Sequence, residues 1–302
     1  MLRFHKLICF LAILTVADFS QAQELSWKFK TGDKFRVKFD QLSNSNTDVL
    51  ERKVAIKNLV EMEVLWQVAE VDDKGTATIV QVINWAKMEM TNTNPDGGTK
   101  SIKVDSREEP KGPVATQMLK DIAPVVGIDK KVKFKMSAVG EISGFEIPKE
   151  TMESIRKAPS SMSIRKIFSD EGMNSLFGPA SVKLPGGASE KGKTWDSSRE
   201  LTSDLGKFTQ KFVYTIADSS DQNTSVINVN CETKRKGKNK SKVEIKSQSG
   251  TGTIRFNLTD GYLSESKFKT EIETETPYRD FKILIKTRDE ATVEIRKVGA
   301  GG

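Results

Sequence analysis

The sequence predicts a mainly β protein of the α+β class, built from two antiparallel lobes with a small helical part between them. Apolar and polar residues alternate with a period of two along many segments, turn signals separate those segments, and helical spacing is confined to the middle of the chain. Each lobe is expected to be strongly curved with long hairpins, and the connector to be a central amphipathic helical pair. The expected units are a signal peptide (1–22), an N-terminal β lobe (23–148), a helical connector (149–182) and a C-terminal β lobe (183–298).

The chain begins like a secretory signal peptide. Basic residues precede an apolar stretch from Leu7 to Val16, and Ser20 and Ala22 then place small residues at the two positions that signal peptidase reads. This stretch is too short to cross a bilayer, which needs about 20 apolar residues. We therefore expect cleavage near Ala22-Gln23, a secreted or periplasmic location, and no transmembrane segment after the signal is removed.

Strand periodicity dominates the N-terminal lobe. Phe35, Val37 and Phe39 alternate with basic residues, and a longer alternating segment runs from Val60 to Val68. Asp72-Asp73-Lys74-Gly75 is a hairpin turn in which glycine can take a positive φ, and the chain returns over 76–90. Arms of about 14 residues are long for a globular protein, which predicts a tall sheet.

Helical spacing is limited to three segments. Proline at the first turn favours a short helix over 113–122, apolar residues three apart favour another over 150–157, and a third is expected over 162–177 before Gly178-Pro179 stops it. The methionine-bearing face of the last two either belongs to the core or borders an adaptable apolar pocket. The candidate ligand-lining residues on that face are Met152, Ile155, Met162, Ile167, Phe168 and Met173.

The C-terminal lobe has the same kind of strand pattern as the N-terminal lobe. Alternating apolar residues mark strands around 208–216, 254–258 and 281–285. A Gly-x-x-(Phe/Trp) element opens a strand at Gly32 and again at Gly192, and a Phe-x-(Met/Leu)-(Ser/Thr) element with a tight turn follows later in each half. These shared elements favour two similar lobes, although hairpins converge on such patterns easily.

The histidine and cysteine content excludes several chemistries. The one histidine, His5, is expected to leave with the signal peptide, and Cys231 is then the remaining thiol. Catalytic triads, Cys-His dyads, ordinary zinc sites and histidine pH switches are therefore not expected. Because Cys231 shares a strand face with Ile227 and Val229, we interpret it as a buried, inert thiol.

One segment matches the phosphate-binding pattern G-x-x-x-x-G-K-T. A true P-loop follows a buried strand and opens a helix, so that backbone amides and lysine converge on phosphates. Here Pro185-Gly186 breaks the preceding strand, and the residues after the loop lack helical spacing. We interpret the match as chance and expect no cofactor and no metal site; its residues are Gly187, Gly192, Lys193 and Thr194.

A basic run stands between two predicted strands, in a chain with a formal net charge of +7. No aromatic residue is interleaved in it, which argues against binding single-stranded nucleic acid, and no nucleic-acid partner is expected. The run is either a solvated hairpin loop or a contact for an anionic surface, such as lipid headgroups or acidic glycan. Its cations are Lys234, Arg235, Lys236, Lys238, Lys240 and Lys242.

Three short elements give the mature chain a resemblance to a known family. They are W-x-F-x-x-G-D from Trp27, D-x-x-G-x-A-x from Asp72, and G-x-x-W from Gly192. In this order they resemble an uncharacterised exported bacterial family, a domain of unknown function, although Lys193 stands where an acidic residue is common and extra residues precede Gly192. The resemblance implies export and a β-rich body and carries no catalytic residues.

Three function classes follow from these patterns. The favoured one is a non-enzymatic exported or envelope protein that binds an apolar or amphiphilic ligand, with lipid or acidic glycan as partner. The second is a structural or interaction protein that docks to anionic surfaces through the basic loop. The third is a histidine-free glycan hydrolase, which needs two facing carboxylates about 5–9.5 Å apart.

Overall fold

The computed structural model describes residues 24–50, 52–157, 182–187, 190–203, 206–217, 219, 221–235 and 243–299. The predicted signal peptide and the predicted helix over 162–177 lie outside these ranges. The elements, in chain order, are β1 (Lys34–Val49), β2 (Arg52–Val71), β3 (Ala77–Thr93), β4 (Thr99–Asp105), α1 (Pro113–Ile122), β5 (Lys131–Met136), β6 (Ile142–Glu146), α2 (Lys149–Lys157), β7 (Thr194–Ser203), β8 (Gly206–Ala217), β9 (Thr224–Arg235), β10 (Glu244–Asn257), β11 (Tyr262–Tyr278) and β12 (Phe281–Val298).

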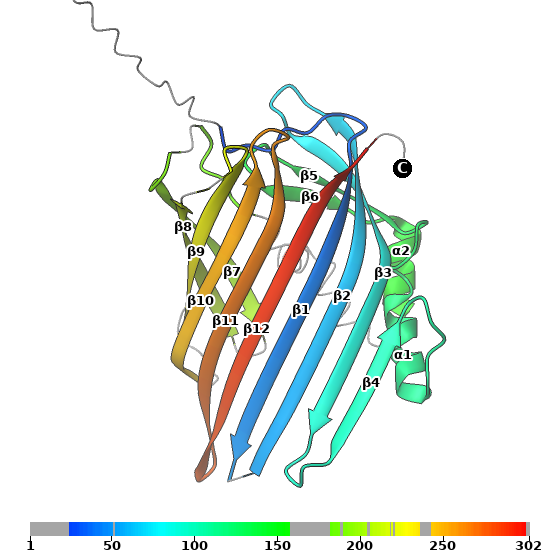
Figure 1. Ribbon diagram of the computed structural model, residues 1–302. Helices are drawn as coiled ribbons and strands as arrows, with labels where there is room; N and C mark the ends of the chain where they lie inside the picture. The colour runs from blue at the N-terminus through cyan, green and yellow to red at the C-terminus, as the bar shows by residue number, and fades with distance from the viewer. Residues whose placement is uncertain are drawn as a thin grey trace, which may run out of the picture.

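All the named strands belong to one antiparallel sheet, in the order β6-β5-β3-β2-β1-β12-β11-β10-β9-β8-β7 (Figure 1). β4 also pairs with β3, next to β5. The prediction of a mainly β, antiparallel protein is thus confirmed. The sheet includes strands from both predicted lobes, because β1 pairs with β12 from Lys34↔Val298 to Asp48↔Leu284.

The predicted hairpin at Asp72–Gly75 joins β2 and β3. Gly75 has a φ of 78°, and the Asp72 carboxylate accepts hydrogen bonds from the backbone amides of Lys74 and Thr76 at 2.9 and 2.8 Å. The side chain therefore holds the turn that the glycine makes accessible. The arms are longer than the sequence predicts, at 20 residues for β2 and 17 for β3.

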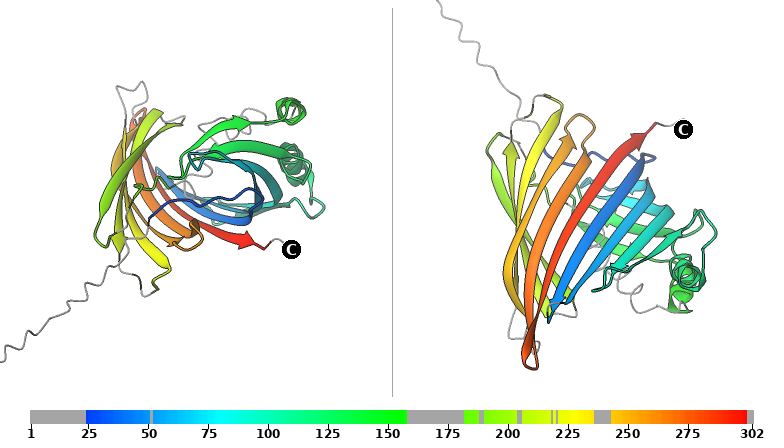
Figure 2. Two further views of the ribbon diagram at one scale, coloured as in Figure 1. Left: turned by 90° about the horizontal axis from the view of Figure 1, so that it is seen from above. Right: turned by 60° about the horizontal axis from the view of Figure 1, so that its bottom comes forward.

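The hydrophobic core lies on one face of the sheet, which we call the core-side face. Alternate residues of the strands, such as Phe35, Val64 and Ile254, are almost fully buried there. The segment 24–33 crosses this face (Figure 2): the amide of Trp27 donates to the carbonyl of Ala138 at 2.8 Å, and that of Lys28 to Gly261 at 2.9 Å. This crossing segment ties the β5–β6 turn to the β10–β11 turn and covers the core between them.

Two glycines on the core-side face of β10 allow unusually close packing. A Cβ added at Gly252 would lie 2.5 Å from Cδ2 of Phe268, and one at Gly250 would lie 2.8 Å from Cβ of Cys231. The ring of Phe268 consequently lies against Gly252 and reaches Phe212, with ring centroids 5.8 Å apart. Glycine in a strand interior marks this kind of close approach.

The two shared strand-opening turns have the same hydrogen bonds. Gly32 and Gly192 both have positive φ, and each donates its amide to a neighbouring strand, to Val68 and Ile216 respectively. Val68 and Ile216 in turn donate to the residue after each glycine. The Gly-x-x-(Phe/Trp) pattern therefore marks equivalent strand starts in the two halves of the sheet.

Both helices lie at the β3–β6 end of the sheet (Figure 1). α1 begins at Pro113 as predicted, directly after Gly112 with a φ of 88°. α2 begins at Lys149 and contributes the fully buried Ile155 to the core.

Candidate functional site

The core-side face extends beyond the buried core along the long arms of β1, β2, β11 and β12. Phe39 and Met62 are the last buried residues of β1 and β2 in this direction. Beyond them the alternate residues are only partly buried, and all but one are uncharged. We call this set the neutral face: Gln41, Ser43, Ser45, Thr47, Val54, Ile56, Asn58, Val60, Thr270, Ile272, Thr274, Thr276, Ile283, Ile285, Thr287 and Asp289.

The opposite face of the same strands carries charged ladders. Glu271 pairs with Lys286 at 2.7 Å and with Arg288 at 2.8 Å, and Lys269 pairs with Glu290 at 3.1 Å. Hydrogen bonds from Lys286 and Arg288 lower the pKa of Glu271 to about 2. Charge is thus concentrated on one side of the long arms and aliphatic and hydroxyl groups on the other.

Carboxylates of β2 and β11 on this opposite face are engaged by neighbouring cations and amides. Glu61 pairs with Lys87 at 2.7 Å, and Glu63 accepts a hydrogen bond from Asn84 at 2.7 Å. A general acid for glycoside cleavage needs a raised pKa, whereas that of Glu271 is lowered. The carboxylates of this surface are therefore better suited to stay ionised in contact with water than to transfer a proton.

A row of polar side chains crosses the core-side face from β7 to β10. Nε of Arg199 donates to Oε1 of Gln210 at 2.8 Å, and Nε2 of Gln210 donates to Oγ1 of Thr233 at 3.3 Å. The amide of Thr233 donates to Oε1 of Gln248 at 2.5 Å. We call these four residues the Arg199 row.

The Arg199 row lies where β9 and β10 separate. Their pairing ends at Thr251↔Asn230, so residues 231–235 of β9 do not pair with β10. The side chain of Gln248 satisfies the amide of Thr233 at this point. The strand register places the end of the row beside the neutral face, because Gln248 lies opposite Ile272 and Ile272 lies opposite Thr287. The row and the neutral face are therefore continuous.

The surroundings of Arg199 are apolar and neutral. Its guanidinium carbon lies 5.0 Å from the ring centroid of Phe212, and Tyr214 and Cys231 are close by. Burial raises the pKa of both the Tyr214 hydroxyl and the Cys231 thiol, so both groups are neutral near pH 7. The buried thiol agrees with its interpretation as an inert core group.

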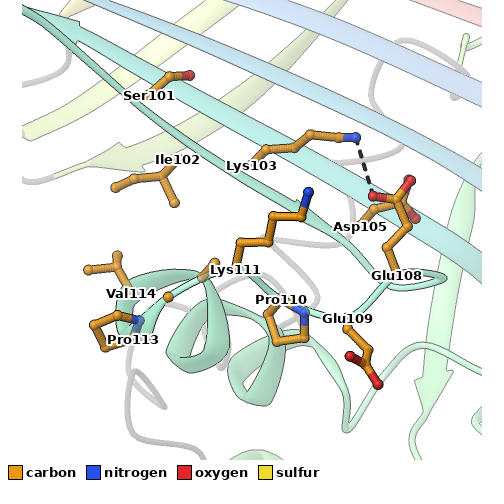
Figure 3. A pocket seen from close by; sticks show the side chains of 12 residues that line it. Ser101, Ile102, Lys103, Asp105, Glu108, Glu109, Pro110, Lys111, Pro113 and Val114 are labelled. Atoms are coloured by element: carbon orange, nitrogen blue, oxygen red, sulfur yellow. Dashed lines mark hydrogen bonds and ion pairs between the residues drawn. The ribbon is translucent and has the colours of Figure 1, made fainter.

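A separate pocket of about 420 Å³ lies between β4 and the start of α1 (Figure 3). Lys103 and Glu108 at its wall pair with each other at 3.4 Å. Asp105 is buried and binds Arg107 through two hydrogen bonds, of 2.8 and 2.7 Å, while Arg107 stacks 4.0 Å above the ring of Trp85. Lys103, Asp105 and Glu108 of this pocket are thus held in ion pairs with neighbouring side chains, and we regard the core-side face as the stronger candidate site.

The predicted ligand-lining residues are described only in part. Ile155 is fully buried in the core, and Met152 is partly buried on α2. Met162, Ile167, Phe168 and Met173 lie outside the described residues.

The basic run is likewise described only at its start. Lys234 pairs with Glu232 at 3.1 Å, and Arg235 donates to the carbonyl of Val243. Lys236, Lys238, Lys240 and Lys242 lie outside the described residues.

The P-loop-like residues open a strand. Thr194 begins β7, and the amide of Gly192 donates to the carbonyl of Ile216 at 2.9 Å. A phosphate-binding loop instead needs a helix at this position, with its amides directed at the ligand. The arrangement is that of a strand start.

Two further properties concern the described residues alone. No group of three or more histidine, cysteine, aspartate or glutamate side chains in those ranges could hold a metal ion. None of the helices described there has the length and apolar character needed to cross a bilayer.

The chain matches no protein-family model, and no curated protein matches it. Among solved structures it is similar to one reported as lipid-protein interactions in lipovitellin, with a TM-score of 0.52 and 11% identity over 91% of this chain. The similar region is 26% of the lipovitellin chain. An outer membrane channel from Pseudomonas putida F1 has a TM-score of 0.25 at 8% identity, covering 92% of this chain and 99% of that one. The first similarity indicates a shared fold, and the second is too low to do so.

Sequence reasoning did not identify the neutral face or the Arg199 row. The signal for the first is present: along β11, every second residue from Thr270 to Thr276 is threonine or isoleucine, while glutamate fills the positions between. The row has no comparable signal, because its four residues come from four strands and meet only through the pairing register.

Proposed function

We propose that this is a non-enzymatic exported or envelope protein that binds an apolar or amphiphilic ligand on the neutral face. One observation carries the proposal. The core-side face continues past its own core as a partly exposed, almost uncharged surface, while the other face of the same strands holds the ion pairs.

The chemistry of the neutral face suits a ligand with a hydrocarbon chain. Isoleucine and valine side chains offer apolar surface, and threonine adds a methyl group beside a hydroxyl that can bind polar atoms. Burying a ligand chain there would contribute about 0.8 kcal/mol per CH₂ group. Such a surface is costly to leave facing water, and a ligand removes that cost.

Two further points support the proposal. The fold is shared with lipovitellin, whose solved structure is reported for lipid–protein interactions. In the view from above, the end strands β5–β6 and β7–β8 turn toward the same side (Figure 2), a curvature that favours holding a ligand against the sheet. Export through the predicted signal peptide is part of the proposal.

Native mass spectrometry of protein purified from the envelope fraction of its own host tests for a bound ligand directly. We expect co-purifying lipid masses that organic solvent extracts. Protein that carries no such mass, and that fails to take up a neutral fluorescent probe such as N-phenyl-1-naphthylamine, would contradict the proposal.

Adjacent residues of β12 provide a matched pair of variants. Ile285 belongs to the neutral face, between Thr47 and Thr274, whereas Leu284 is exposed on the other face, between Asp48 and Glu275. Ile285→Lys should weaken probe binding by about ten-fold or more, because a cation on the apolar face must lose hydration when a ligand covers it. Leu284→Lys should leave binding unchanged, and equal effects of the two variants would locate the ligand elsewhere.

A further inference from the structure

Arg199 is a cation on the core-side face that has no anionic partner among the residues that the structure describes. It is half-buried on β7, and its interactions are one hydrogen bond to Gln210 and the contact with the Phe212 ring. Within the described part of the chain, no carboxylate forms an ion pair with it. The hydrogen bond to Gln210 uses Nε alone, so no acceptor in the described ranges engages the two terminal nitrogens, whose four N–H groups can donate to a ligand.

Two cations on the opposite face of the neighbouring strands are paired with carboxylates. Lys211, on the opposite face of β8, binds Asp196 at 2.9 Å, and Lys234 on β9 binds Glu232 at 3.1 Å. Burial lowers the pKa of Arg199 from its ordinary value, which reflects the cost of removing water from the guanidinium. A half-buried guanidinium is normally compensated by an anion, because neutral groups repay only part of that cost.

We propose that Arg199 binds the carboxylate of a fatty-acid-like amphiphile whose hydrocarbon chain lies on the neutral face. This inference rests on the proposed function and names the ligand class for that site. A guanidinium presents a planar fork of donors that matches the two oxygens of a carboxylate. Gln210 accepts a hydrogen bond from Nε and the Phe212 ring lies against the guanidinium, and these two contacts hold the fork in place.

The register places head and chain on one continuous surface. The Arg199 row ends at Gln248, which is opposite Ile272 of the neutral face, and Ile272 is followed across the sheet by Thr287, then Ser45. A ligand anchored at Arg199 can therefore lay its chain over β10 to β12 without crossing a charged side chain of the row. Neighbouring strands are about 4.8 Å apart, so the five steps from β7 to β12 span about 24 Å, a distance comparable to an extended fatty acyl chain.

The test compares oleate with oleyl alcohol, which share a chain and differ in the charge of the head. Each ligand displaces N-phenyl-1-naphthylamine from the full mature protein, and its Kd is obtained from the fluorescence. We expect the unmodified protein to bind oleate at least about ten-fold more tightly than oleyl alcohol, and Arg199→Gln to weaken oleate by about ten- to hundred-fold while leaving oleyl alcohol within about two-fold.

Control variants separate charge at this site from charge in general. Arg255→Gln removes the same charge from an exposed position of β10 and should leave both Kd values unchanged. Arg199→Lys keeps the charge without the fork and should recover part of the oleate affinity. The preference of the unmodified protein for oleate is measured without any variant, so a misfolded variant does not leave the question open.

The outcomes distinguish this inference from the proposed function. Binding of both ligands with equal affinity, unaffected by Arg199→Gln, would overturn the role of Arg199 while supporting an apolar site. Binding of neither ligand, together with no probe uptake, would overturn both.

Discussion

Replacing Asp105 by asparagine tests whether the ion pair at the end of β4 stabilises the edge of the sheet. The Asp105 side chain is 2% exposed and binds the Arg107 guanidinium at two points, and a third hydrogen bond comes from the Arg107 amide at 3.0 Å. These bonds lower the pKa of Asp105 from 3.8 to about 2. Because the Arg107 side chain is 52% exposed, solvent screens part of the attraction.

The lowered pKa gives the size and the pH dependence of the effect. A shift of this size corresponds to at most about 2.4 kcal/mol, and screening by solvent reduces the expected loss to about 1–2 kcal/mol. The folded-state pKa lies below the unfolded value, so the stabilisation is complete above about pH 5 and is lost as the pH falls through the folded-state pKa. The free-energy difference between the two proteins should therefore be about half as large at pH 3 as at pH 7.

Urea unfolding followed by circular dichroism at both pH values measures this difference. Asp129→Asn is the matched control, because the exposed carboxylate of Asp129 also pairs with its neighbour, Lys130, and should contribute little. A loss for Asp105→Asn that is equally large at pH 3 and pH 7 would refute the reasoning, since an ionised carboxylate could not be its source.

The remaining predictions concern the close packing at β10 and the buried thiol. Gly252→Ala should lower the free energy of unfolding by about 1–3 kcal/mol, because the new Cβ would lie 2.7 Å from the Lys267 carbonyl oxygen as well as against Phe268. Gly299→Ala, whose Cβ would meet nothing within 4 Å, should change nothing, and equal urea midpoints for the two variants would contradict the packing argument. Because burial raises the pKa of Cys231, its reaction with a disulfide reagent at pH 8 should be at least about ten-fold slower in the folded protein than in denaturant; comparable rates would show an accessible thiol.

Local features of the chain were predictable because they depend on neighbouring residues. Alternation of apolar and polar side chains marks strands, since successive side chains point to opposite faces. The turn at Asp72–Gly75 follows from a side chain that accepts local amides and a glycine that takes positive φ. The start of α1 at Pro113 follows from a residue without an amide hydrogen at a position that needs none.

The candidate site was predictable only in its general character. An apolar or amphiphilic ligand was inferred from the absence of catalytic groups and from the methionine-bearing helices. The described part of α2 contributes Ile155 to the core, whereas the partly exposed neutral surface lies on the sheet. The sequence patterns of the long arms had indicated strands, without showing which strand faces the ligand and where the core ends.

The sequence by itself determined the alternation that marks several strands, the turn at Asp72–Gly75 and the start of the first helix, because backbone sterics and side-chain alternation act over a few residues. The tertiary structure decided that β1 pairs with β12, that both halves share one sheet, and that Arg199, Gln210, Thr233 and Gln248 meet in one row. Pairing between distant segments depends on the free energy of the whole assembled sheet, in which burial must repay the entropy of closing long loops. A short stretch of sequence therefore cannot show which distant strands pair.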